Sequence, residues 1–114
     1  MSRSSKNSLQ TKSVAKIKIG PLHYDVLRRP VPVTEGESGN VLGRVVYEES
    51  KIVVANNLSK ENEMLTIFHE AFHALMWHCG VKDQDERFVE TASGFLFDMI
   101  RDNPKLIAAI QATA

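Results

Sequence analysis

The 114-residue sequence predicts one α+β domain, in which a small antiparallel sheet of three or four strands precedes two main helices and a short C-terminal helix. Two patterns predict this class. Within residues 14–55, runs rich in valine and isoleucine alternate with polar residues and are separated by turn residues, which is typical of half-buried strands. Within residues 59–102, apolar side chains recur every three or four positions, which is the period of amphipathic helices.

The first two strands are expected to form a hairpin. Residues 1–13 are rich in serine, lysine and asparagine and offer little to bury, so we expect a disordered tail there and a single domain over 14–114. VAKIKI (14–19) alternates apolar and basic residues, as a half-buried strand does. The Gly-Pro pair after it marks a turn, and LHYDVL (22–27) returns as the second strand.

The rest of the sheet is expected after a long loop. RRPVPVTEGESGN (28–40) holds two prolines and two glycines, and its length suggests a functional role. VLGRVVYEE (41–49) is typical of a strand, and KIVVA (51–55) is expected to be a short buried strand that follows a turn.

The helical half shows recognisable start and stop signals. Ser59 stands where an N-cap belongs, before the first periodic run, and a glycine follows that run. Asp83 is expected to cap the second helix, with Glu86 three residues later in a capping-box pattern. Pro104 ends this helix, because the residue before a proline is driven out of the helical conformation. The following KLIAAIQ is expected to form the short last helix.

Composition excludes several classes of function. Fourteen basic residues balance fourteen acidic ones, so the chain has neither the charge expected for nucleic-acid binding nor a polybasic anchor for a membrane. The single cysteine, Cys79, rules out an internal disulfide framework and fits a reducing compartment. The N-terminus lacks the apolar run of a secretory signal, and no stretch approaches the length of a membrane span. We therefore expect a cytoplasmic protein.

The motif HEAFH predicts a zinc site. It places His69 and His73 four residues apart, so both imidazoles lie on one face of a helix, one turn apart. Two nitrogens at this spacing bind one zinc ion, and Glu70 beside the first histidine is placed to act as general base. Zinc lowers the pKa of a bound water from about 15.7 toward 7, within reach of a carboxylate. Because polar groups in an apolar run need partners, we favour this interpretation over a metal-free helix.

Zinc needs a third protein ligand, and the acidic start of the second helix offers three candidates. Glu86 borders the apolar face of this helix and is expected to point at the first helix, so it is the favoured ligand. Glu90, one turn later, lies farther toward solvent and is the second choice, and Asp85 is a weaker third. Acids at a helix start often interact with the helix dipole alone, which leaves the choice open.

Three other polar side chains have more general expectations. Tyr24 and Tyr47 carry phenols able to stabilise an oxyanion, but nothing in the sequence places either of them near the motif. His78 lies about 140° round the helix from His73. We expect His78 at the helix C-terminus, where the dipole favours a cation, and away from the zinc site.

HEAFHAL, a short acidic gap and DERFVETASGFLFDMIRDNP together resemble the small H-E-x-x-H proteins common in bacteriophage and prophage genomes, distant relatives of the ImmA/IrrE-type metallopeptidases. The resemblance covers residues 14–104 and rests on His69, Glu70 and His73, which match the ligand–base–ligand pattern one for one. It implies a minimal zincin-like domain in the cytoplasm of a bacterial host. It also implies a glutamate ligand at the start of the second helix.

The favoured function is therefore a gluzincin-like zinc metallopeptidase that cleaves a specific protein, with Glu70 as general base. Members of the resembled group usually carry further segments, so here we expect strand 51–55, taken as a sheet edge, and the 30–40 loop to recognise substrate. The main alternative is a zinc-stabilised, non-catalytic module that docks on a host or phage protein. A metal-free helical interaction domain is the third candidate.

Overall fold

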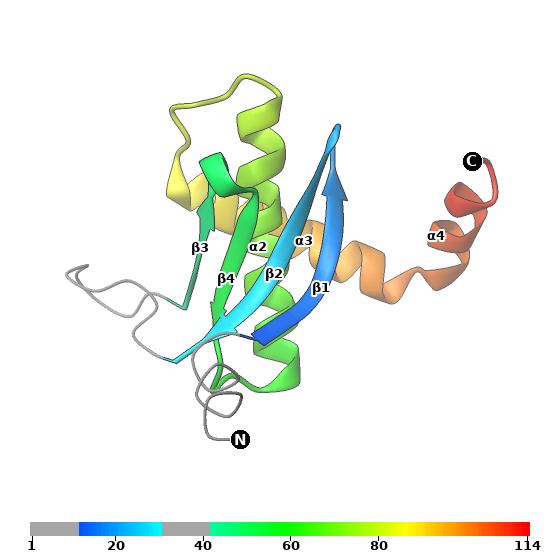
Figure 1. The fold of residues 1–114 in the computed structure, drawn as a ribbon. Coiled ribbons are helices and arrows are strands. Elements are labelled where there is room, and N and C mark those ends of the chain that lie inside the picture. Colours follow the sequence, from blue (N-terminus) through cyan, green and yellow to red (C-terminus); the bar gives the residue numbers. More distant parts are fainter. Residues whose placement is uncertain (1–11, 31–41) are drawn as a thin grey trace.

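The computed structural model describes residues 12–30 and 42–114 (Figure 1). Most of the expected tail at 1–13 and of the loop at 28–40 lies outside these residues. The elements in chain order are β1 (Lys12–Ile19), β2 (Leu22–Arg29), β3 (Gly43–Val46), a 3₁₀ turn η1 (Tyr47–Glu49), β4 (Lys51–Ala55), α2 (Lys60–His78), α3 (Glu86–Asp102) and α4 (Pro104–Gln111). The α+β class, with a four-stranded sheet followed by two main helices and a short C-terminal one, is confirmed.

The sheet is mixed rather than wholly antiparallel, which corrects one expectation. Its strand order is β1-β2-β4-β3, with β1–β2 and β3–β4 antiparallel and β2–β4 parallel. The chain leaves β2, forms β3, and then turns through η1 so that β4 inserts between β2 and β3. KIVVA is therefore a central strand with partners on both sides, and it offers no free edge to a peptide. The proposed role of residues 51–55 in substrate binding is wrong for that reason.

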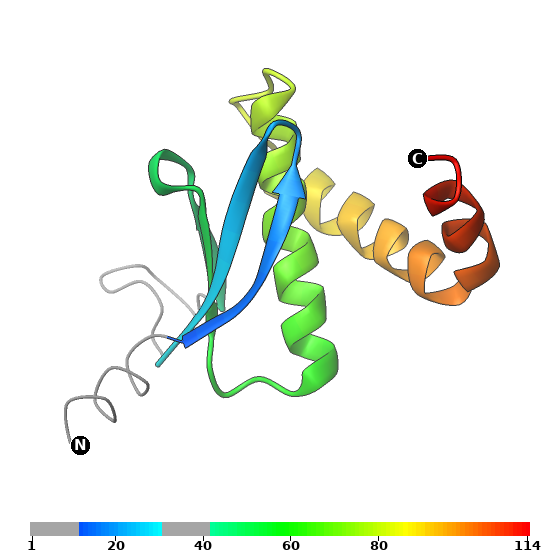
Figure 2. The same ribbon diagram turned by 45° about the vertical axis from the view of Figure 1, so that its right-hand side comes forward.

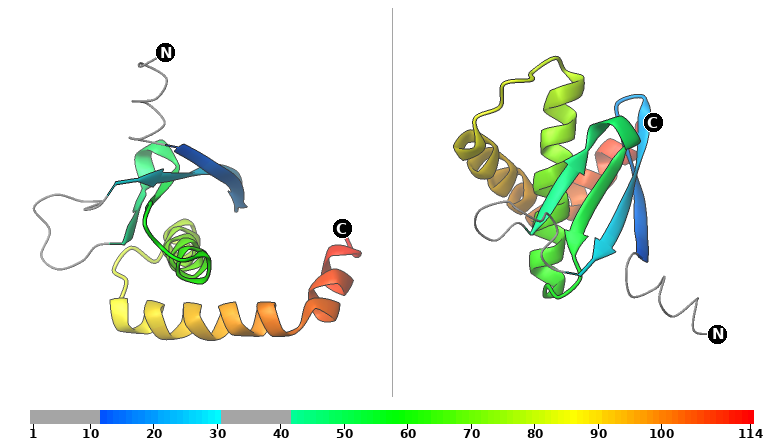
Figure 3. Two further views of the ribbon diagram at one scale, coloured as in Figure 1. Left: turned by 90° about the horizontal axis from the view of Figure 1, so that it is seen from below. Right: turned by 60° about the vertical axis from the view of Figure 1, so that its left-hand side comes forward.

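Three layers build the domain. The sheet packs on one side of α2, and α3 runs across the other side of α2 (Figure 3). The core between the sheet and α2 consists of fully buried strand residues facing apolar helix residues: Tyr24, Val26, Ile52, Val54, Ile67 and Ala74. None of the helices in the two described segments combines the length and the apolar character needed to cross a bilayer.

The ends of the two main helices fix the register of the site. Ser59 caps α2 as predicted, because its side-chain oxygen accepts a hydrogen bond from the Asn62 N–H at 3.2 Å. The cap of α3 is Asp85, which accepts from the Arg87 N–H at 3.0 Å, so the prediction of Asp83 is wrong by two residues. Either aspartate suits a helix start, and here the later one takes the cap. As a result, Glu86 is the first residue of α3.

Two polar contacts hold α2 on the sheet. The Arg28 guanidinium of β2 makes a two-point ion pair with Glu63 of α2, whose side chain is only 8% exposed. Hydrogen bonding to Arg28 lowers the pKa of the Glu63 carboxyl, against the opposing effect of burial. At the other end of α2, the hydroxyl of buried Tyr24 lies 2.8 Å from His78 Nε2. Each end of the helix is thus anchored to β2, and the histidine motif lies between the two anchors.

Candidate metal centre

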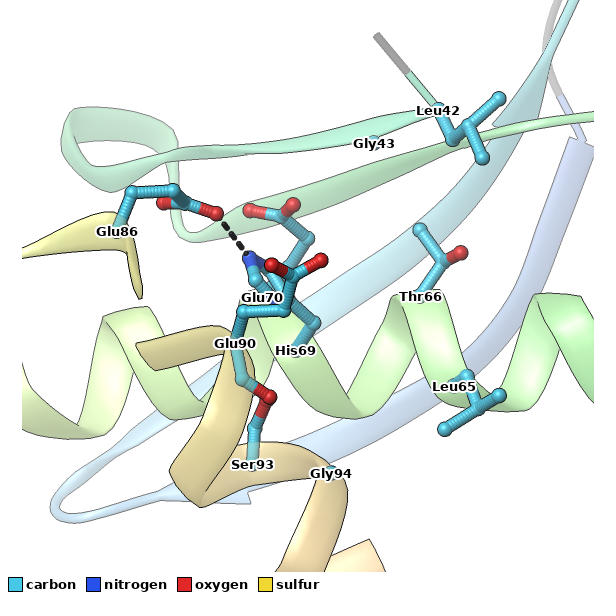
Figure 4. Close-up of a pocket in the computed structure, with 10 residues that line it drawn as sticks. All are labelled: Leu42, Gly43, Leu65, Thr66, His69, Glu70, Glu86, Glu90, Ser93 and Gly94. Carbon is cyan, nitrogen blue, oxygen red and sulfur yellow. Dashed lines mark hydrogen bonds and ion pairs between the residues drawn. The ribbon is translucent and has the colours of Figure 1, made fainter. Parts of the chain in front are cut away.

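His69 and His73 lie on successive turns of α2 and face the first residue of α3. Their ring centroids are 5.0 Å apart, and both side chains are largely buried. One Glu86 oxygen lies 2.8 Å from His69 Nε2, and its other oxygen lies 2.9 Å from His73 Nε2 (Figure 4 shows the first contact). The three candidate donor atoms all lie within 4.8 Å of one another. The fold therefore brings together two nitrogens and one carboxylate from two helices.

The alternative acidic ligands occupy different positions. Glu90, one turn along α3, lines the cleft beside His69 but is not part of the three-residue donor cluster. Asp85 accepts the capping hydrogen bond at the start of α3. Of the three acids considered from the sequence, Glu86 is the one that contacts both histidines.

A glutamine that the sequence analysis did not single out fixes the orientation of His73. The Gln84 amide nitrogen donates to the His73 carbonyl at 3.2 Å and to the Val81 carbonyl at 2.9 Å. This arrangement sets the direction of the amide, so its oxygen faces His73 Nδ1. Because an amide oxygen only accepts, Nδ1 carries the proton. In the neutral imidazole, Nε2 then has its lone pair directed toward Glu86.

This tautomer makes the donor cluster suited to a cation. Neutral His73 and the Glu86 carboxylate present two acceptors to each other at 2.9 Å, which is unfavourable without a proton or a cation between them. A divalent ion would satisfy both histidines and the carboxylate together. Two imidazoles and one carboxylate form the ligand set of many catalytic zinc sites, and Glu86, 66% exposed, has room to adjust. The residues present therefore fit a zinc ion.

Glu70 lies beside the donor cluster without being part of it. Burial raises the pKa of its carboxyl from 4.5 to about 7, while nearby His73 lowers it and nearby Glu86 raises it. A carboxyl with a pKa near 7 can both accept and return a proton at neutral pH. The position and the pKa of Glu70 both suit a general base.

Two clefts adjoin the cluster along edge strand β3. The larger, of about 560 Å³, lies toward the start of β3, and the smaller, of about 300 Å³, lies toward η1. Glu70, Glu86 and Gly43 line both. Figure 4 shows Glu70, Glu86 and Glu90 gathered around His69 between β3, α2 and the start of α3. The site is thus open to a ligand that extends along the strand.

The two tyrosines considered as oxyanion stabilisers lie in different places. Tyr47 of η1 lines the smaller cleft with Glu70, His73 and Glu86, and its ring stacks on Trp77 with centroids 4.2 Å apart. Its hydroxyl interacts with the Gln84 side chain, and burial raises its pKa. Tyr24 is fully buried in the core. Only Tyr47 is therefore placed to act on a bound ligand.

Sequence reasoning missed three features of this site: Gln84, Gly43 and the proximity of Tyr47. Gln84 lies in the acidic link VKDQDE. A neutral amide between two aspartates was the feature that could have marked it as a site residue. Gly43 allows β3 to approach α2, since an added Cβ would lie 2.7 Å from Thr66 Cγ2 and 3.4 Å from Glu70 Cγ. A glycine inside a strand pattern is a known sign of such close approach.

Comparison with known proteins adds no further identification. No family model matches the chain, and no curated protein or solved structure is significantly similar to it.

Proposed function

We propose that this protein is a zinc-dependent peptidase. One observation carries the proposal: a donor cluster of two histidines and a glutamate lies next to a second, half-buried glutamate, Glu70, which lines both clefts. A structural zinc site needs the ligands but has no use for a proton acceptor at this position. The resemblance to small H-E-x-x-H proteins agrees with this proposal.

Each residue of the site has a separate role in the proposed hydrolysis. His69, His73 and Glu86 would hold the ion. When bound, zinc would supply the Lewis acidity that activates water and polarises a substrate carbonyl. Glu70 accepts a proton from water in the cleft and returns it to the departing amine as the C–N bond breaks, so its proton count is restored in each turnover. Tyr47 lines the smaller cleft, and its hydroxyl would donate to the carbonyl oxygen.

The substrate is proposed to be an extended peptide segment. In the described part of the chain, β3 pairs with β4 alone, so its outer edge has backbone donors and acceptors free for another strand. This edge borders both clefts, one on each side of the position of Glu70. A peptide added to β3 would therefore pass over the donor cluster.

The experiment combines metal content and hydrolysis. Purified wild type, Glu70→Gln, His73→Ala and a matched control, Glu90→Gln, are assayed for bound zinc and for cleavage of an unbiased peptide mixture. We expect near-stoichiometric zinc in all but His73→Ala, and cleavage in wild type and Glu90→Gln only. Absence of zinc from the reconstituted wild type would refute the proposal, as would equal cleavage by wild type and Glu70→Gln.

A second candidate function follows from the two helices that supply the metal-ligand side chains. The donors come from two helices, so an ion there would tie α3 to α2 and stabilise the fold without catalysis. In that case the protein would be a zinc-stabilised binding module. This function would be favoured if zinc raises the melting temperature and no peptide is cleaved. The zinc content and melting temperature of Glu70→Gln should then equal those of the wild type.

A further inference from the structure

The last two helices leave an unusual amount of apolar side chain exposed. Ten large hydrophobic residues are exposed in the described segments, and six of them lie on α3 and α4. We call five of these the α3–α4 face: Phe88, Phe95, Met99, Leu106 and Ile110. The sixth, Ile100, lies roughly 20° round α3 from buried Val89, on the inner side of the helix, and is not counted. Phe95 is 73% exposed, and Phe88 and Ile110 are each more than half exposed. A concentration of this kind on one part of a surface is typical of an interaction site.

Three of the four exposed large apolar residues of α3 form a line separate from the face that packs on α2. Phe88, Phe95 and Met99, with half-buried Ala92 between them, are spaced four, three and four positions apart, so they lie along one side of the helix. Val89 and Ser93 are buried and belong to the inner side. Thus α3 has an inner face that meets α2 and an outer apolar line that nothing in the described structure covers.

The helix α4 shows the same lack of a partner. It has eight residues, none of them buried, and Ile107 alone is partly covered. It extends from the end of α3, away from the sheet and α2 (Figures 1 and 2). Isolated helices shorter than about 12 residues are marginal in water, so a helix of this length normally depends on packing. A surface that covers Leu106 and Ile110 would provide it.

We propose that the α3–α4 face is the interface of a homodimer. A large aromatic side chain buries roughly 150–250 Å². Weighted by the exposed fractions, the five side chains offer roughly 500 Å² per chain, hence roughly 1,000 Å² for two copies. That area is about the minimum that a specific interface needs. A continuous apolar line on a helix can meet the same line of a second copy about a two-fold axis.

The charges next to the face are partly compensated within each copy. Asp98 and Asp102 would repel their counterparts in a second copy, but both pair with Arg101 of the same chain, at 2.8 and 3.5 Å. Glu61 on α2 pairs with the same arginine. One positive charge against three negative ones weakens this repulsion without cancelling it, so association should be stronger at high salt.

This interface is independent of the proposed zinc site. Glu86 and Glu90 lie on the side of α3 that borders the cleft, whereas the outer apolar line lies on another side of the helix. Dimer formation would leave the cleft open in both copies. Variants that disrupt the interface should therefore bind zinc as the wild type does, so a failure of either proposal is distinguishable from a failure of the other.

Sedimentation equilibrium of the full chain tests the proposal, from about 1 to about 200 µM protein. The wild type is expected to dimerise within this range, and Phe95→Glu with Ile110→Glu to raise the dissociation constant roughly 100-fold or more. Leu22→Glu, a change at an exposed apolar residue of β2, is the matched control and should dimerise like the wild type.

Circular dichroism confirms that each variant is folded, and hydrogen exchange of the α4 amides gives a second measurement. Protection of these amides should fall on dilution of the wild type and be low at all concentrations in the double variant. A wild type that stays monomeric at the highest concentration would overturn the proposal, and so would a double variant that dimerises as the wild type does. Binding of monomeric wild type to phospholipid vesicles through this face would assign it to a lipid surface instead.

Discussion

Gly43 is the point of closest approach between the edge strand and the helix that carries the histidines, so Gly43→Ala tests the packing on which the site depends. The added Cβ would lie 2.7 Å from Thr66 Cγ2 and 3.1 Å from the Val53 carbonyl oxygen. Carbon atoms in favourable contact are about 3.5–4.0 Å apart, so the clash with Thr66 amounts to roughly 1 Å. Overpacking of this kind typically costs about 1–3 kcal/mol. We expect Gly43→Ala to lower the free energy of unfolding by that amount.

A second substitution identifies the atom responsible. Thr66→Ser removes the methyl group that the new Cβ would meet and keeps the hydroxyl that donates to the Asn62 carbonyl at 2.7 Å. In Gly43→Ala with Thr66→Ser, we expect about half or more of the loss to be recovered, because the contact with Val53 remains. Urea unfolding followed by circular dichroism at constant pH measures all four proteins of the cycle.

Additivity would refute this reasoning. If the two single changes sum to the double change within about 0.5 kcal/mol, the methyl group of Thr66 is not what opposes the alanine. The unfolding slope m should be equal in all four proteins, which excludes a change in the unfolded state as the cause.

Three further predictions concern single side chains. The pairing with Arg28 lowers the pKa of Glu63 in the folded state. The stability that this ion pair contributes is therefore fully present above the ordinary glutamate pKa of about 4.3. It is lost as the pH falls through the lower pKa of the folded state. Glu63→Gln should therefore reduce stability at pH 6 to 7 and narrow its difference from wild type toward pH 3, as measured by urea unfolding of the metal-free proteins. Glu86→Gln should weaken zinc binding more than about 100-fold, and Glu90→Gln by less than about threefold, in competition with a chromophoric chelator. Gln84→Ala should weaken zinc binding by about 10–100-fold in the same titration, because the imidazole that it orients is then free to turn.

Each of these has an outcome that contradicts it. A constant difference between wild type and Glu63→Gln from pH 7 to 3 would mean that the ion pair does not stabilise the folded state. Equal zinc affinity in Glu86→Gln and Glu90→Gln would assign the third ligand elsewhere. If Gln84→Ala binds zinc as tightly as the wild type, Gln84 does not contribute to the zinc site.

Local patterns predicted the elements of the fold well. The two-residue period identified the strands, and Ser59 identified the start of α2, because both signals depend on neighbours in sequence. The motif spacing alone implied that His69 and His73 share a face of the helix. The preference for Glu86 over Glu90 followed from their positions on a helical wheel, and the structure places Glu86 against both histidines.

Features that depend on distant contacts were not accessible in this way. The parallel pairing of β2 with β4 joins Asp25 to Lys51, and no local pattern distinguishes it from an antiparallel partner. The start of α3 depended on which of two equally suitable aspartates took the cap. Gln84 and Tyr47 reach the site through the link before α3 and through η1, whose paths follow from how the elements pack together.

The position of the connection between β2 and β3 bears on how such a protein could change its specificity. This connection leads directly into Leu42 and Gly43, which line the larger cleft, while the residues that hold and orient the donor cluster lie on α2, α3 and the link between them. Lengthening a connection is inexpensive, since each doubling costs about 0.6 kcal/mol in closure entropy. A replacement at Leu42 would change the wall of the larger cleft while His69, His73 and Glu86 stay in register. Selection for new binding preferences could therefore act on this wall without renewed selection for the fold.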